Sequence, residues 1–164
     1  MAAAQNRVKV RPAACCAWRL RLARLLAFLL RLRYRDTPMH DPKRILVVED
    51  HRDTLNMLGL YLSGAGLLVE TATDGMEAVA KVSASPPDAI VLDLGLPTVD
   101  GWNVARRVKA DARTRDIPII AVSGQYGLGE MNDRAQAVGF ATCLVKPCAP
   151  SALLQALRMV LTQP

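Results

Sequence analysis

Residues at four separate places in the chain carry side chains that could do chemistry together. They are a pair of adjacent acids, Glu49 and Asp50, a third acid, Asp93, a hydroxyl, Ser123, and a lysine, Lys146. Taken singly, each is an ordinary capping or loop residue. Brought together, three carboxylates would repel one another unless a cation joined them, and hard oxygen ligands suit Mg²⁺. A carboxylate beside Mg²⁺ can attack phosphorus, while a lysine and a hydroxyl stabilise the phosphoryl oxygens.

The elements that must position these residues are alternating strands and helices. Each chemical residue follows or ends an apolar run of strand length, and helical stretches separate the runs. The expected strands span 44–49, 67–72, 89–92, 117–122 and 140–145. This (βα)₅ order predicts an α/β fold, with a parallel sheet covered by helices on both faces. Because such sheets bind ligands at the carboxyl ends of their strands, the sequence predicts that the five residues share one cleft.

The helices between the strands are expected from apolar periodicity and from their caps. Asp74 and Asp100 are predicted to cap the second and third helices. The side chains predicted to face inward are Leu55, Leu58 and Leu62; Met76, Val79 and Ala80; Val104 and Val108; Leu128, Met131, Ala135 and Val138; and Leu153, Leu154, Leu157, Val160 and Leu161.

Composition indicates a globular domain with a basic head. The 164 residues are 51% hydrophobic and 22% charged, and the net charge is +6. Residues 1–44 hold eleven Lys and Arg against two Asp, whereas residues 45–164 hold ten against thirteen Asp and Glu. The positive charge therefore belongs to the head and does not favour direct nucleic-acid binding by the body. The four cysteines lack Cys-x-x-Cys spacing, which favours a reduced, cytoplasmic location.

Residues 1–43 are expected to be an Arg- and Leu-rich extension. Residues 18–35 have an uninterrupted apolar run only at 25–30, too short to span a membrane. They are compatible with weak contact to an anionic membrane surface or with an organelle transit peptide. The favoured interpretation is a leader upstream of a natural start at Met39.

Four segments together resemble the receiver domain of two-component response regulators. They read LVVEDH (46–51), VLDLGLPTVDGW (91–102), AVSG (121–124) and LVKP (144–147), and the resemblance covers 44–162. It implies a flavodoxin-like doubly wound sheet of order 2-1-3-4-5, in three layers. It further implies that Asp93 accepts a phosphoryl group from a histidine kinase or a histidine phosphotransfer protein.

The resemblance also assigns roles to the other site residues. Asp50, Asp93 and the backbone carbonyl of Gly95 would hold Mg²⁺, with Glu49 acting through bridging water. Lys146 would contact the phosphoryl group, and Ser123 would be the switch hydroxyl. Pro147 would follow Lys146 in a cis peptide bond, and Gly95 and Gln125 occupy positions that tune dephosphorylation.

Two positions depart from the family pattern. Cys143 stands where an aromatic residue usually precedes the lysine by three positions, so the usual coupling of the hydroxyl to an aromatic switch is expected to differ. Cys148 follows Lys-Pro, where a larger apolar residue is common. Both cysteines are interpreted as packing residues.

The resulting prediction is an output-less response regulator, with a receiver at 44–164 that signals by docking to a downstream protein. It would have no enzymatic turnover beyond its own phosphorylation and dephosphorylation, and homodimerisation through the last helix remains open. A receiver fragment of a hybrid histidine kinase is the alternative. A haloacid-dehalogenase-like phosphohydrolase would need a second acid where Gly95 stands, and an FMN-binding flavodoxin would need a phosphate loop where Glu49, Asp50 and His51 stand.

Overall fold

The computed structural model describes residues 42–97, 99–124 and 134–162. Within them a five-stranded parallel sheet has the order β2-β1-β3-β4-β5, which confirms the predicted topology. The strands and helices are β1 (Arg44–Val48), α2 (Arg52–Gly64), β2 (Leu68–Ala72), α3 (Gly75–Ala84), β3 (Ala89–Asp93), α4 (Gly101–Ala110), β4 (Ile119–Ser123), β5 (Thr142–Val145) and α6 (Pro150–Leu161).

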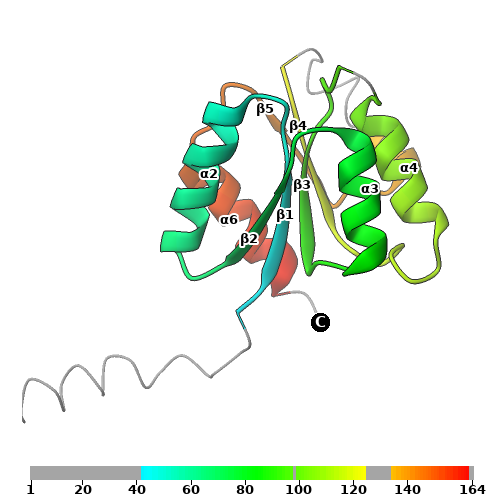
Figure 1. The fold of residues 1–164 in the computed structure, drawn as a ribbon, viewed down its shortest axis with the longest axis horizontal. Helices are drawn as coiled ribbons and strands as arrows, with labels where there is room; N and C mark the ends of the chain where they lie inside the picture. The colour runs from blue at the N-terminus through cyan, green and yellow to red at the C-terminus, as the bar shows by residue number, and fades with distance from the viewer. Residues whose placement is uncertain (1–41, 98, 125–133, 163–164) are drawn as a thin grey trace, which may run out of the picture. The chain divides into compact units, whose positions relative to one another are not determined.

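The sheet lies between two layers of helices, with α2 and α6 on one face and α3 and α4 on the other (Figure 1). Successive residues of β1 alternate between the two cores: Ile45 and Val47 pack with α2 and α6, and Leu46 and Val48 pack with α3 and α4. The continuous apolar runs of β1, β3 and β4 are buried on both faces for this reason. The predicted three-layer sandwich is therefore confirmed.

The start of β1 is fixed by one carboxylate at the amino edge of the sheet. Asp88 accepts a hydrogen bond of 2.8 Å from Nζ of Lys43 and one of 2.7 Å from the backbone N–H of Arg44. This contact joins the entry to β1 with the entry to β3. It lies at the opposite end of the strands from the predicted chemical residues.

The predicted inward face of α3 is wrong at Met76 and Ala80 and right at Val79, which packs against the core. Met76 is 53% exposed and Ala80 is exposed, whereas Ala78 and Val82 are buried and Val79 is half-buried. The small residues of this helix face its neighbour, because a Cβ on Gly75 would lie 2.6 Å from a methyl group of α4. Close helix packing thus selects the small side chains for the core and leaves the methionine outside.

The other predicted helix faces agree with the structure where they are described. Three predicted stripes are buried: Leu55, Leu58 and Leu62 in α2, Val104 and Val108 in α4, and Leu153 and Leu157 in α6. Three further predicted residues of α6 are partly buried against the core: Leu154, Val160 and Leu161. Asp74 and Asp100 cap α3 and α4 through hydrogen bonds of 2.8 Å to backbone N–H groups.

The structure also changes the bounds of the last two strands. β4 begins at Ile119, just after Pro118, and β5 begins two residues later than expected. In the predicted fourth helix, residues 134–138 are helical and Ala135 is buried, while Leu128 and Met131 lie outside the described residues. Gln125 and nearly all of the predicted extension 1–43 also lie outside them. No helix in the described ranges has the length and apolar content needed to cross a membrane.

Candidate phosphoacceptor site

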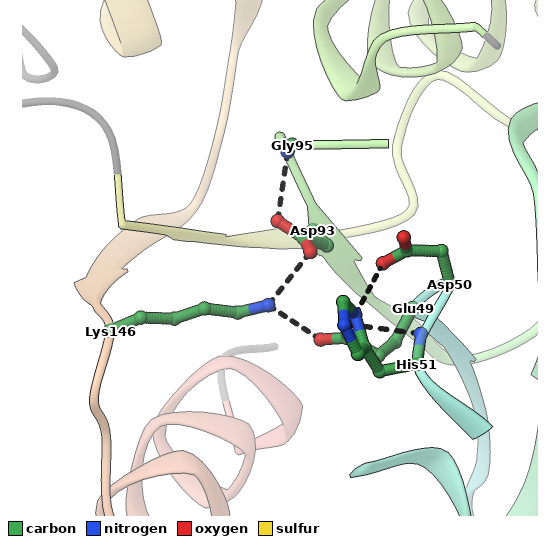
Figure 2. A network of polar contacts seen from close by, with 6 residues as sticks. All are labelled: Glu49, Asp50, His51, Asp93, Gly95 and Lys146. Carbon is green, nitrogen blue, oxygen red and sulfur yellow. Dashed lines mark hydrogen bonds and ion pairs between the residues drawn. The ribbon is translucent and has the colours of Figure 1, made fainter. Parts of the chain in front are cut away.

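The carboxyl edge of the sheet brings four of the five predicted chemical residues into one network. Glu49 and Asp50 directly follow β1, Asp93 is the last residue of β3, and Lys146 directly follows β5. The parallel register places the acids together, since Val48 pairs with Leu92 and the next residue along the chain is an acid in both cases, Glu49 and Asp93. Figure 2 shows the side chains converging from these three strand ends.

Lys146 is the centre of this network. Its Nζ lies 2.6 Å from Oε2 of Glu49 and 2.7 Å from Oδ2 of Asp93. The two carboxylate side chains are only 5% and 8% exposed, so the ammonium supplies the positive charge that their burial requires. Burial lowers the pKa of Lys146, but the hydrogen bonds to Asp93 and Glu49 outweigh it and raise the pKa above its ordinary 10.5.

The second oxygen of Asp93 is held by the backbone. The N–H of Gly95 donates a 2.8 Å hydrogen bond to Oδ1 of Asp93, and a Cβ at position 95 would stand 3.4 Å from that oxygen. The turn after β3 is further fixed by Gly101, where a Cβ would overlap the carbonyl oxygen of Asp93. Asp93 is therefore oriented by Lys146 on one oxygen and by a main-chain donor on the other (Figure 2).

Glu49, Asp50 and His51 form a second part of the site. Each of the three offers one atom that could bind a metal ion, and these atoms lie within 4.8 Å of one another. Nδ1 of His51 is 3.1 Å from Oδ1 of Asp50. Burial raises the pKa of Asp50, yet the hydrogen bond with His51 outweighs it and holds the pKa below 3.8. The same hydrogen bond raises the pKa of His51 above 6.5. The sequence analysis did not predict this contact; the position of His51 directly after two strand-end acids was the available signal.

The residues present fit the Mg²⁺ ion that the family resemblance implies. Two carboxylates, Glu49 and Asp93, contact the Lys146 ammonium, and a third, Asp50, lies beside Glu49 and His51. The site therefore holds more carboxylates than lysine ammonium groups, and carboxylate oxygens are the ligands that Mg²⁺ prefers. Asp50 is 29% exposed and lies at the rim. Asp93 and Gly95, which the resemblance also assigns to the ion, make other contacts in this structure. Asp93 is hydrogen-bonded to Lys146 and lies outside the cluster of Glu49, Asp50 and His51, and Gly95 contacts Asp93 through its N–H.

Ser123 and Pro147 border the same edge. Ser123 ends β4 and is 1% exposed, and its carbonyl oxygen accepts a 2.8 Å hydrogen bond from the N–H of Lys146. The Lys146–Pro147 peptide bond is cis, as predicted. Cys143 is half-buried in a cluster with Leu94 and Trp102, which agrees with its interpretation as a packing residue.

A cavity of about 440 Å³ opens beside Asp93 and Lys146, between α2 and α6. Apart from the site residues its walls are largely apolar, with Met57 and Leu58 on α2, Leu153 on α6, and Cys148 on the connecting loop. Cys148 packs against the core on this side of the sheet. The small thiol at this position leaves space next to the acidic network.

Comparison with known sequences gives one family. The family model described as the response regulator receiver domain matches residues 45–158. The DNA-binding dual master transcriptional regulator RpaA of Synechocystis is 35% identical over 120 residues, which are 72% of this chain and 48% of that protein. Response regulator PleD of Caulobacter vibrioides is 38% identical over 106 residues, 63% of this chain and 23% of that protein. The chain thus spans about half, or less, of these relatives.

Solved structures agree in fold. The chemotaxis response regulator CheY4 of Vibrio cholerae has a TM-score of 0.68 and 32% identity, covering 73% of this chain and 98% of that one. The receiver domain of the sensor histidine kinase PA1611 of Pseudomonas aeruginosa, solved with a magnesium ion in its active-site cleft, has a TM-score of 0.67 and 28% identity, covering 74% and 99%. With five parallel strands in the flavodoxin-like order and the family match across residues 45–158, the chain belongs to the receiver domains of two-component response regulators.

Proposed function

We propose that residues 44–164 receive a phosphoryl group on Asp93 in a His-to-Asp phosphorelay. The observation that carries the proposal is the placement of Asp93 Oδ2 at 2.7 Å from Nζ of Lys146, beside two further carboxylates at the carboxyl edge of the sheet. A buried acid would ordinarily be protected from reaction. This one lies against a cation at the wall of an open cavity.

The chemistry follows from the groups around Asp93. A carboxylate oxygen of Asp93 attacks the phosphorus of a phosphohistidine; the O–P bond forms, the P–N bond breaks, and its electron pair stays on the imidazole nitrogen. Lys146 offsets the charge on the phosphoryl oxygens, and the Ser123 hydroxyl is proposed to donate to one of them. Mg²⁺, held by Asp50, Asp93 and the Gly95 carbonyl with Glu49 acting through water, would add positive charge at those oxygens.

The phosphoryl donor must bring its histidine to a side chain that is only 8% exposed. Close to the cavity, α2 carries exposed apolar side chains: Met57, Leu60 and Tyr61 are 45%, 78% and 41% exposed. Their spacing of three and four residues puts them on one stripe of the helix. We propose that a histidine kinase or histidine phosphotransfer protein docks on this stripe.

Output is proposed to pass through a downstream protein in the cytoplasm. Residues 45–164 hold ten Lys and Arg against thirteen Asp and Glu, which does not favour nucleic-acid binding by the receiver itself. Cys143 occupies the position of the usual aromatic switch, so the signal is proposed to leave through the cluster that Cys143 shares with Leu94 and Trp102.

The test is intact-mass analysis of the full chain after incubation with acetyl phosphate and Mg²⁺. A single phosphoryl adduct is expected for the wild type and none for Asp93→Asn. The matched control is Asp88→Asn, since Asp88 also pairs with a lysine at 2.8 Å but lies at the other end of the strands. An adduct that persists in Asp93→Asn, or no adduct on the folded wild type, would refute the assignment.

A further inference from the structure

The cavity between α2 and α6 has the size of a small-molecule site. Its volume is about 440 Å³, whereas packed protein interiors leave few voids larger than a water molecule. Val47, Val91 and Val122, on three neighbouring strands, line it and belong to the core cluster on this face of the sheet. An apolar space that could hold a ligand therefore borders Asp93, which lines the same cavity.

Two side chains of the wall make this space accessible. Cys148 is small, and burial raises the pKa of its thiol above 9.0, so the thiol is neutral at physiological pH. Met57 of α2 also lines the cavity and is 45% exposed. Because methionine is unbranched and adaptable, it can move aside for a molecule that enters from solvent.

The charged end of the cavity has more acids than bases and one poorly satisfied oxygen. Glu49, Asp93 and Lys146 line this end, and Lys146 contacts Oε2 of Glu49 at 2.6 Å. Within the described residues, Oε1 of Glu49 has only long contacts, to the N–H of His51 at 3.4 Å and to its Nδ1 at 3.5 Å. The Glu49 side chain is 5% exposed, and a buried carboxylate oxygen ordinarily accepts a shorter hydrogen bond.

We propose that the cavity binds a compact organic cation, with a protonated amine at the Glu49 carboxylate and an aromatic or branched aliphatic body between the apolar walls. The charges at the lined end decide the class of ligand. An anionic head would add a third negative charge beside Glu49 and Asp93, and a neutral head would leave Oε1 of Glu49 without a charge-assisted hydrogen bond. A protonated amine supplies that donor and reduces the excess negative charge.

A cation bound in this cavity inhibits phosphoryl transfer. Asp93 lines the cavity, and Lys146 joins it to Glu49 through contacts of 2.6 and 2.7 Å. An amine at Glu49 lowers the negative charge around Asp93 and competes with Mg²⁺ for the same group of carboxylates. The cavity is thus an inhibitory ligand site of the receiver, a role that rests on the proposed phosphorylation of Asp93.

The head group is tested on the full chain with phenethylamine, phenethyl alcohol and phenylpropionate, which share a phenyl ring. In saturation-transfer NMR titrations without Mg²⁺, the amine is expected to bind about tenfold more tightly than the alcohol, and the carboxylate more weakly than both. Glu49→Gln is expected to remove the advantage of the amine. The matched control Glu70→Gln, on β2 and outside the lining of this cavity, is expected to keep it. Equal binding of amine and alcohol, or an advantage that persists in Glu49→Gln, would overturn the proposal.

The place of binding is tested by filling the cavity and by cutting back its wall. Cys148→Phe is expected to weaken phenethylamine binding about fivefold or more, since its ring takes space that the ligand needs. Met57→Ala removes apolar contact and is expected to weaken binding about threefold. Met159→Ala, on α6 at a side chain that is 63% exposed and does not line the cavity, is the matched control. Circular dichroism checks folding, and the methionine pair decides if Cys148→Phe does not fold. Unchanged binding in Met57→Ala, or equal weakening in Met159→Ala, would overturn the proposal.

The inhibitory role is tested by intact mass on the same samples. Saturating phenethylamine is expected to slow adduct formation from acetyl phosphate and Mg²⁺ by about fivefold or more in the wild type. Reciprocally, Mg²⁺ is expected to weaken binding of the amine. Binding without slower adduct formation would overturn the inhibitory role. The absence of an adduct on the folded wild type without amine would instead refute the proposed function, while the binding titrations still decide the ligand site.

Discussion

Replacing Lys146 with methionine tests the electrostatic account of the site. The substitution keeps an unbranched side chain of similar size but removes the ammonium between Glu49 and Asp93. Their nearest oxygens contact the same nitrogen at 2.6 and 2.7 Å, so they lie within about 5 Å of each other. Two unit charges at that distance repel by about 3 kcal/mol at an effective dielectric constant near 20. Because the Lys146 side chain is 33% exposed, water screens part of this repulsion.

We therefore expect Lys146→Met to lower the free energy of unfolding by about 1–3 kcal/mol at pH 7.5 without divalent ions. Urea unfolding followed by circular dichroism measures this difference. Adding Asp93→Asn to Lys146→Met is expected to recover most of the loss, since a neutral amide no longer repels Glu49. Mg²⁺ is expected to stabilise Lys146→Met more than the wild type.

Three results would refute this reasoning: a urea midpoint for Lys146→Met equal to that of the wild type, a double variant no more stable than Lys146→Met, or equal stabilisation of both proteins by Mg²⁺. The first would mean that water already screens the repulsion between the Glu49 and Asp93 carboxylates. The second would mean that the loss comes from packing of the lysine stem. The third would mean that the cation does not replace the ammonium.

Further predictions concern the surroundings of the site. Gly101→Ala is expected to lower the free energy of unfolding, measured with urea, by about 2–3 kcal/mol, because the new Cβ would lie 2.8 Å from Cα of Leu94. The control, Gly59→Ala in α2, has nothing within 4 Å of the new Cβ and should raise the free energy of unfolding by about 0.5–1 kcal/mol. Equal effects of the two substitutions would contradict the close approach at Gly101. Cys148→Leu should fill part of the 440 Å³ cavity and raise the thermal midpoint by about 3–5 °C; a lower midpoint would mean that leucine does not fit. Burial opposes ionisation of Asp88, but its lysine and backbone contacts outweigh it and hold the pKa below 3.8. Its contribution is present above the unfolded pKa and lost as pH falls through the folded one, so the stability gap to Asp88→Asn should narrow below pH 3.8. A gap that is constant with pH would contradict this.

Local patterns were sufficient to predict the elements that carry the site. Strands buried on both faces leave continuous apolar runs, and the acids that follow β1 and end β3 stand out against them. The same approach failed on α3, where Met76 was predicted to face inward but Ala78 and Val82 are buried. Apolar periodicity marks a helix, but the face that is buried depends on how closely the neighbouring helix approaches.

Contacts between distant parts of the chain were only partly predictable. Glu49 and Lys146 are 97 residues apart, and parallel strand order was enough to bring them to one edge. Two contacts depend instead on register and side-chain packing: the choice of carboxylates that the Lys146 ammonium contacts, and the hydrogen bond of His51 with Asp50.

Sequence patterns alone predict the alternation of strands and helices, the receiver motifs and the strand-end positions of the acids, the hydroxyl and the lysine. These features are local, because burial, capping and turn chemistry act over a few residues. The packed fold sets the contacts of Asp93 with Lys146 and with the Gly95 N–H, and it places Cys148 at the border of a cavity. Those outcomes depend on distances between segments remote in the chain, which only the packed fold defines.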